Sequence, residues 1–298
     1  MMTRIATGFT LAAVLLALLA FDYFTYPYCL GLLILAMGGL LMAAWELAGL
    51  LPIDNRPHPI AAVLSVGVIV VAGWIPTVPS LEWLHPHRAA TLLVVFCGLI
   101  IVHFLVAMRY YHGPAGVVAR LAALVFITGY LGLLPASLLS LRWAGGDNAA
   151  VGLACILVTI LTTKFCDIGA YFTGRMAGKH RMTPLLSPRK TWEGLTGGLA
   201  LATLTSVVGW WLTGGLLGLP VSPLWSAGFG LSLGLAGAMG DLAESMIKRD
   251  LGIKDAANWL PGFGGMLDLV DALLFAAPVA WFWLVLVPHF VPGGPLVR

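Results

Sequence analysis

The apolar residues of this chain fall into long runs that are separated by short polar segments. A helix of about 20 mostly apolar residues crosses a bilayer. Nine runs reach or approach this length, at 5–21, 28–51, 60–79, 90–108, 116–140, 149–173, 193–216, 224–245 and 271–290. The pattern predicts an all-α, polytopic integral membrane protein with about nine transmembrane helices. The first run resembles a signal peptide. However, cleavage after Ala20 would place Leu18 at the −3 position, where small residues are usual, so we expect a retained anchor.

Composition agrees with this prediction, because 60% of the 298 residues are hydrophobic and only 10% are charged. Such a balance excludes a soluble enzyme. No period of 20–50 residues and no low-complexity tail is present, which excludes solenoids and disordered arms. The four cysteines all lie in apolar runs without paired spacing, so we expect neither a disulfide framework nor a zinc motif.

The distribution of Lys and Arg predicts the orientation in the membrane, since cytoplasmic loops are enriched in both. With nine spans, one side carries Arg88, Arg142 and Arg298, while Lys164 lies inside the sixth span. The other side carries twelve: Arg4, Arg56, Arg109, Arg120, Arg175, Lys179, Arg181, Arg189, Lys190, Lys248, Arg249 and Lys254. We therefore expect a cytoplasmic N-terminus and an external C-terminus.

The long polar segment from Gly240 to Asp271 carries the strongest chemical signal. Carboxylates lie on both sides of a turn rich in Gly and Pro, at or near the ends of apolar runs, where charge is costly and usually functional. In a helix, one face would carry Asp241, Glu244, Ser245 and Lys248, and the next helix would carry Asp268 and Asp271 on a shared face. This arrangement predicts a site for a divalent cation and phosphates.

A second polar segment, 164–194, is basic. Lys164 and Asp167 are three residues apart and would neutralise one another inside a span. The following basic residues have an ordinary explanation as topology signals or contacts to anionic lipid. The run from Ser187 to Thr191 (SPRKT) also supplies hydroxyls at a predicted helix N-terminus, which favours phosphate binding.

Together these segments resemble the phosphatidate cytidylyltransferases, or CDP-diacylglycerol synthases. One block reads D-x-x-A-Y-x-x-G-R followed by S-P-R-K-T-W-E-G, over 167–194. The other reads G-D-L-x-E-S-x-x-K-R-x-x-G-x-K-D followed by P-G-x-G-G-x-x-D-x-x-D, over 240–271. The sequence departs from the family pattern at Phe263, where histidine is usual, and at Leu269, where arginine is usual.

The resemblance implies attack of a phosphatidate phosphate on the α-phosphorus of CTP, with release of pyrophosphate. Such chemistry depends on alignment and charge neutralisation, and Mg²⁺ suits carboxylate ligands. We expect Asp241, Asp268 and Asp271 to be catalytic metal ligands, for two such ions or for one with a monovalent partner, and Lys248 to assist catalysis. The substrates would be held by Ser187, Arg189, Lys190, Thr191, Ser245, Arg249, Lys254 and Asp167.

The predicted spans and the two polar segments also indicate how the chain is organised. We expect a transmembrane scaffold over 1–145 and a catalytic transmembrane domain over 146–298, with cytoplasmic loops at 174–193 and 246–270. The partners would be CTP, phosphatidic acid and membrane lipids, with no nucleic acid. The family suggests a homodimer, and the compact chain fits a bacterial inner membrane with its active site facing the cytosol.

Several side chains have ordinary explanations beside the functional ones. First-turn carboxylates such as Asp268 and Asp271 also stabilise a helix by about 0.3–1 kcal/mol each. Glu46 is either a buried carboxylate paired with a neighbouring helix or a distant wall of a polar cavity, and His103 is expected to be a satisfied packing residue. The small residues at Gly230, Gly234, Gly237 and Gly240 predict close helix packing.

Three other functions remain open. A CTP-dependent lipid alcohol kinase would transfer the γ-phosphoryl group, although the motif through Asp268 and Asp271 favours cytidylyl transfer. A secondary transporter would use Glu46, Lys164 and Asp167 as an ion pathway, but the polar residues gather on one side of the membrane. A paralogue with an altered acceptor is suggested by Phe263 and Leu269.

Overall fold

The computed structural model describes residues 2–75, 81, 83–84, 87–113, 116–146, 148–219, 221–257, 259 and 264–286. Over these residues the chain is almost entirely helical, and its β structure is one short hairpin. Seven helices of this described part are long and apolar enough to cross a membrane. Helices are expected there because hydrocarbon offers no partners to backbone polar groups. The prediction of an all-α polytopic membrane protein is confirmed.

Each of the nine predicted spans contains a helix, but two helices fall outside the group of seven. Helix α3 (Pro59–Trp74) has only 16 residues. Helix α9 (Pro223–Asp250) has 28 residues, but its many glycines and the charged residues near its C-terminal end lower its mean hydropathy. The segment 174–193, predicted as a loop, contains the end of a helix and the hairpin. The orientation in the membrane stays a prediction.

The chain divides into two compact units, which are described separately below. The first unit comprises Met1–Leu139 together with Asp255–Leu269, and the second comprises Ser140–Lys254 together with Val270–Arg298. The segment 255–269 thus groups with the N-terminal helices. The functional division near residue 145 stays a prediction.

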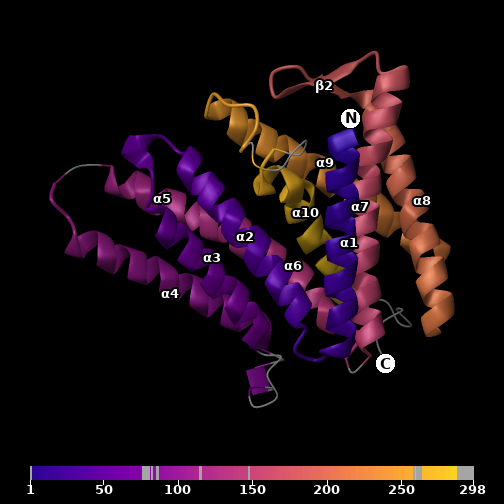
Figure 1. Cartoon of the computed structure of the whole chain (residues 1–298), viewed down its shortest axis with the longest axis horizontal. Coiled ribbons are helices and arrows are strands. Elements are labelled where there is room, and N and C mark those ends of the chain that lie inside the picture. The colour runs from indigo at the N-terminus through magenta and orange to yellow at the C-terminus, as the bar shows by residue number, and fades with distance from the viewer. Residues whose placement is uncertain are drawn as a thin grey trace. The chain divides into compact units, whose positions relative to one another are not determined.

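The first unit is a bundle built around α2 and α3. Helix α2 packs along α3, which also contacts α4 and α5. Its elements are α1 (Met2–Phe24), α2 (Leu30–Leu50), the 3₁₀ turn η1 (Ile53–Asn55), α3, α4 (Arg88–Arg109), α5 (Val117–Thr128), the π-helical segment η4 (Gly129–Leu133) and α6 (Leu134–Ser140) (Figure 1). His103 on α4 lies 2.8 Å from the Ser65 hydroxyl on α3, measured from Nε2 to Oγ, so it is a satisfied packing residue as predicted.

The second unit is organised by α7 and α8, which run side by side in Figure 1. Its elements are η5 (Leu141–Trp143), α7 (Ala149–Ala177), β1 (Arg181–Thr183), β2 (Ser187–Thr191), α8 (Trp192–Leu217), α9, the part of α10 (Met266–Trp281) from residue 270, and the π-helical η6 (Phe282–Leu286). The close approach of α7 and α8 depends on glycine, since a Cβ at Gly169 would lie 2.9 Å from the Gly197 carbonyl oxygen. The first turns are capped by the side chains of Asn148, Thr191 and Ser222.

The apolar core of the second unit is aromatic where α8, α9 and η6 meet. Trp210, Trp225, Phe229 and Trp283 make edge-to-face and stacked ring contacts with centroids 5.5–6.5 Å apart. Aromatic pairs of this geometry add about 0.5–1.5 kcal/mol beyond the burial of their area. This core fixes α9 against α8, and the other half of α9 carries the polar residues described next.

Candidate active site

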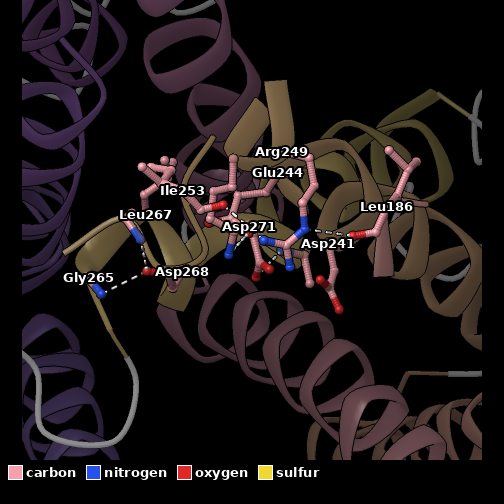
Figure 2. A network of polar contacts seen from close by, with 12 residues as sticks. Leu186, Asp241, Glu244, Arg249, Ile253, Gly265, Leu267, Asp268 and Asp271 are labelled. Atoms are coloured by element: carbon pink, nitrogen blue, oxygen red, sulfur yellow. Dashed lines mark hydrogen bonds and ion pairs between the residues drawn. The ribbon is translucent and has the colours of Figure 1, made fainter. Parts of the chain in front are cut away.

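Three carboxylates of the second unit lie close together, and we call them the carboxylate cluster: Asp241 and Glu244 on α9, and Asp271 on α10. One oxygen from each lies within 4.8 Å of the others, a spacing that permits a shared metal ion (Figure 2). Glu244 and Asp271 are buried, and Asp241 is partly exposed. Buried carboxylates are costly to leave without compensation, so the arrangement is typical of a functional site.

The cluster exists because α9 and α10 approach each other at a glycine. Asp241 and Glu244 are three residues apart and therefore share a face of α9. The preceding residue, Gly240, faces α10, where a Cβ would lie 2.6 Å from the carbonyl oxygen of Asp271 and 3.2 Å from Cβ of Phe275. The predicted packing role of the small residues of α9 is confirmed, because Gly230, Gly234 and Gly237 also leave a Cβ no more than 3.0 Å from its nearest neighbour.

Two lysines neutralise part of the cluster. The Lys190 ammonium on β2 lies 2.8 Å from Oδ2 of Asp241, and Lys248 on α9 forms an ion pair with Glu244 one turn earlier. Glu244 is the more deeply placed, with only 1% of its side chain exposed. Asp271 accepts a hydrogen bond from the amide of Ala272. Lys164 and Asp167 on α7 also act electrostatically on Asp271. Four carboxylates against three lysines leave a net negative charge, which favours a bound cation.

A cavity of about 430 Å³ adjoins the cluster through Asp241. It is lined by residues of α7, the hairpin, α8 and α9: Cys166, Asp167, Ala170, Tyr171, Gly174, Arg175, Met182, Arg189, Lys190, Thr191, Gly194, Leu195, Ala238 and Asp241. Three of these residues are cationic and two are acidic. A site of this volume accommodates a substantial part of a small-molecule ligand, and its cations suit phosphate groups.

The hairpin that carries Arg189 and Lys190 is fixed at its base. Thr191 accepts a hydrogen bond from the amide of Gly194, with 3.0 Å between oxygen and nitrogen, and so caps α8. Glu193, in the first turn of α8, accepts hydrogen bonds from the amides of Lys179 and His180 and pairs with the His180 ring. These contacts hold the strand that brings Lys190 to Asp241.

Arg249, which we expected to bind substrate, contacts backbone groups in this structure. Its Nε lies 3.2 Å from the carbonyl oxygen of Leu186, and a second guanidinium nitrogen lies 2.9 Å from that of Ile253 (Figure 2). Leu186 belongs to the hairpin turn and Ile253 to the turn after α9. The guanidinium therefore connects the hairpin to the end of α9, a role that was not predicted from the sequence.

Asp268, which belongs to the first unit, contacts backbone amides. Its Oδ2 accepts hydrogen bonds from the amides of Gly265 at 2.8 Å and Ala256 at 3.0 Å (Figure 2). A side chain in the first turn that reaches back to the amide three residues earlier resembles half of a capping box. The structure brings Asp241 and Asp271 together with Glu244, while Asp268 caps the start of α10.

The remaining predicted residues have varied surroundings. Asp167 lines the cavity and lies 3.8 Å from the Lys164 ammonium, as the predicted ion pair requires. Ser245 is buried on α9, Ser187 begins β2, and Lys254 is exposed in the turn after α9. Leu269 is a partly exposed residue of α10, whereas Phe263 lies outside the described residues.

Glu244 was expected on the face of α9 that carries the predicted cation site, but it was not expected to be a metal ligand, although its spacing from Asp241 carried that signal. Two residues of the cavity were not predicted from the sequence. Tyr171 and Arg175 both line the cavity. They stand within the D-x-x-A-Y-x-x-G-R block, one and two turns after Asp167, so helical spacing would have found them.

Glu46, left open between two interpretations, is a buried acceptor in the first unit. Its carboxylate accepts hydrogen bonds from the indole of Trp259 and from the amides of Met266 and Leu267. Glu46 is thus a buried carboxylate paired with a neighbouring helix, which is the first of the two interpretations. Its partners at and near the start of α10 are backbone and indole N–H groups.

Comparison with known proteins agrees with these motifs. The chain matches the model of the cytidylyltransferase family over residues 2–287. It is 38% identical over 143 residues to phosphatidate cytidylyltransferase of Mycobacterium tuberculosis H37Rv, covering 48% of this chain and 41% of that protein. The same identity extends over 144 residues of the Synechocystis phosphatidate cytidylyltransferase, covering 48% and 47%, and over 137 residues of the uncharacterized protein YnbB of Escherichia coli K12, covering 46% and 44%.

The matched stretch spans about half the length of these curated relatives. The family match, in contrast, extends over nearly the whole chain, and it confirms the resemblance carried by the two blocks. This protein belongs to the cytidylyltransferase family.

Proposed function

We propose that this protein transfers the cytidylyl group of CTP to phosphatidic acid, giving CDP-diacylglycerol and pyrophosphate. The observation that carries the proposal is a cluster of three carboxylates at the wall of a cation-lined cavity. Asp241 belongs to both, so a cation in the cluster and phosphates in the cavity would be neighbours. The names of the Mycobacterium and Synechocystis relatives support the same reaction.

The cavity supplies groups for both phosphate-bearing substrates. Arg175 and Arg189 offer planar guanidinium groups that bind phosphate in bidentate fashion, while Lys190 acts as a point charge. Lys190 already balances Asp241, so the two groups set the position of one another before a substrate arrives. Asp167, at the same wall, is proposed to orient the nucleotide.

The carboxylate cluster fits Mg²⁺, because all of its donors are carboxylate oxygens, which this hard cation prefers. Asp241, Glu244 and Asp271 would hold the ion, and Asp268 stays a proposed ligand that serves as a cap in this structure. When bound, the ion would neutralise negative charge on the phosphates. A second such ion or a monovalent cation is an expectation from the family resemblance.

The chain itself needs no covalent nucleophile for this reaction. The attacking group is a phosphate oxygen of the lipid, which is largely ionised near neutral pH, since the second pKa of a phosphate monoester is about 6. The residues therefore act by alignment and charge neutralisation. Lys190, Arg175 and Arg189 would oppose the charge of the triphosphate, and Lys248 would maintain the charge balance of the buried Glu244.

The proposed setting is a bacterial inner membrane, with the N-terminus and the active site on the cytosolic side. The twelve-to-three distribution of Lys and Arg supports this orientation. CTP is a cytosolic metabolite, so a site on the other side would lack its substrate. A homodimer remains an expectation from the resemblance.

The test is product analysis with purified protein in detergent, phosphatidic acid and Mg²⁺. Parallel reactions contain CTP labelled at the α-phosphate or at the γ-phosphate. We expect α-label in CDP-diacylglycerol and none of the γ-label in lipid. Transfer of the γ-label to a lipid alcohol would show a kinase, and the absence of nucleotide consumption would overturn the enzyme proposal.

A matched pair of variants ties the reaction to the cluster. Asp241→Asn removes a charge from the cluster, while Asp250→Asn changes an exposed carboxylate nine residues later on α9. We expect Asp241→Asn to lose activity and Mg²⁺-dependent thermal stabilisation, and Asp250→Asn to keep both. Equal effects of the two variants would contradict the assignment of the cluster.

A further inference from the structure

Glu46 holds the start of a helix that it does not belong to. It lies on α2, with 9% of its surface exposed, and its two oxygens have different partners. Oε1 accepts hydrogen bonds from the Trp259 indole and, at 2.9 Å, from the Met266 amide, while Oε2 lies 2.9 Å from the Leu267 amide. All of these groups belong to the first unit.

The backbone opposite Glu46 is shaped to receive the carboxylate. A Cβ at Gly265 would lie 2.6 Å from Oε2 and 2.9 Å from Oε1 of Glu46, so a larger residue would displace the carboxylate. The neighbouring Gly264 has φ of +91°, a conformation that favours glycine. This turn therefore lets the Glu46 carboxylate approach the first amides of α10.

The chemistry of a helix start explains the choice of an acidic residue. The first amides of a helix have no partner within it, and the N-terminal end carries partial positive charge. Capping is usually done by a local side chain. Here the amides of Met266 and Leu267 are satisfied by a carboxylate about 220 residues earlier in the chain. Asp268 adds a local contact to the Gly265 amide at the same helix start.

We infer that Glu46 is a positioning residue for the carboxylate cluster, acting through α10. Asp271 follows Leu267 by four residues, about one helical turn. The angle and register of the first turn therefore set the position of the Asp271 carboxylate. Resting on the proposed function, this inference assigns a role to a residue outside the two sequence blocks.

The partners of Glu46 argue against an ion-pathway role. Both of its oxygens accept hydrogen bonds, and within the described part of the chain every donor is a backbone or indole N–H group. Among the described residues no cation forms an ion pair with it. A group that passes ions would need an exchangeable partner, whereas these donors are fixed in the fold.

The test compares Glu46→Gln, Glu46→Ala and Glu46→Asp with Asp22→Asn. Asp22 is a matched control, because it is a buried carboxylate that accepts a hydrogen bond from the Leu32 amide, at a distance of 3.0 Å, in the α1–α2 hairpin. The readouts are binding of Mn²⁺ to the purified full chain, followed by electron paramagnetic resonance, and amide hydrogen exchange at Met266 and Leu267. Neither readout depends on turnover.

We expect Glu46→Gln and Glu46→Ala to weaken Mn²⁺ binding by about 10- to 100-fold, as loss of a group that orients a ligand does. Exchange at the two amides should rise in the same variants. Glu46→Asp, which keeps the charge on a shorter stem, should weaken binding less. Asp22→Asn should leave both readouts as in the wild type even where it lowers thermal stability.

The outcomes separate this inference from the proposed function. Mn²⁺ affinity that is unchanged in every Glu46 variant overturns the positioning role, whatever reaction the wild type catalyses. If the wild type binds Mn²⁺ but forms no CDP-diacylglycerol, the proposed function is overturned. The comparison of the Glu46 variants then still decides whether Glu46 positions the carboxylate cluster. A wild type that binds no Mn²⁺ overturns both.

Discussion

The contact between α9 and α10 at Gly240 predicts a sharp effect of one methyl group. In Gly240→Ala the new Cβ would lie 2.6 Å from the Asp271 carbonyl oxygen, whereas ordinary contact begins at 3.4 Å. The difference, 3.4 minus 2.6, requires movement of about 0.8 Å. The obstacle is backbone, so the strain cannot be relieved by a side-chain rotation. The two helices must separate where they carry Asp241 and Asp271.

The expected magnitude follows from two opposed terms. Overpacking of a tight contact typically costs about 1–3 kcal/mol, while replacing a helical glycine by alanine contributes about 1 kcal/mol of stability. Gly98 on α4 supplies the control, since a Cβ there meets nothing within 4 Å. Gly98→Ala should gain only the second term. The two variants should therefore differ by about 1–3 kcal/mol in the free energy of unfolding, which is the packing term alone.

Function should respond more strongly than stability. A displacement near 1 Å of a catalytic group can reduce a rate about 100-fold, so we expect kcat/KM for CDP-diacylglycerol formation to fall by about that factor in Gly240→Ala. The assays are thermal unfolding in detergent and initial rates over a range of Mg²⁺ concentrations. Indistinguishable behaviour of Gly240→Ala and Gly98→Ala in both assays would refute the argument that this contact sets the geometry of the cluster.

Three further substitutions test individual contacts. Lys248→Met removes the ion-pair partner of the buried Glu244 and should cost about 3 kcal/mol of stability, measured by thermal unfolding, with Lys248→Arg less affected. Asp268→Asn keeps an oxygen acceptor for the capped amides, whereas Asp268→Ala does not. If Asp268→Asn keeps wild-type activity and Asp268→Ala loses it, Asp268 acts as a cap. Loss of activity in both variants would support a role as metal ligand. In Arg249→Lys, a single ammonium group cannot contact both the hairpin and the turn after α9. The hairpin should therefore be cleaved faster by trypsin, and an unchanged rate of cleavage would contradict the connecting role of Arg249.

The fold was predictable because hydropathy and helix length act locally along the chain. Apolar runs located the helices, and the helical spacing of Asp241 and Glu244 was visible before the structure. The small residues of α9 also predicted its close packing against neighbouring helices. In each case neighbours in sequence suffice, since a bilayer allows little other than helices.

The sequence could not reveal which carboxylates share a site, because that depends on contacts between distant segments. Asp268 and Asp271 look equivalent in a helical pattern, yet one caps amides and the other joins the cluster. Arg249 stands within a family block but reaches two carbonyl oxygens. Glu46 was ambiguous because its partners lie more than 200 residues away. The partners of Glu46 and the approach of Asp271 to Asp241 and Glu244 depend on how segments far apart in the sequence meet in the fold.

The length of α9 has a consequence for how a lipid would reach the site. Asp241 follows Pro223 by 18 residues, which corresponds to about 27 Å along a helix. The hydrocarbon core of a bilayer is about 30 Å thick. A helix that enters the hydrocarbon at Pro223 therefore brings Asp241 to the depth of the opposite headgroup layer, where lipid phosphates already lie. In the proposed reaction, a membrane-anchored phosphate would meet a cation held by the carboxylate cluster without leaving its leaflet, and only the water-soluble nucleotide would have to travel.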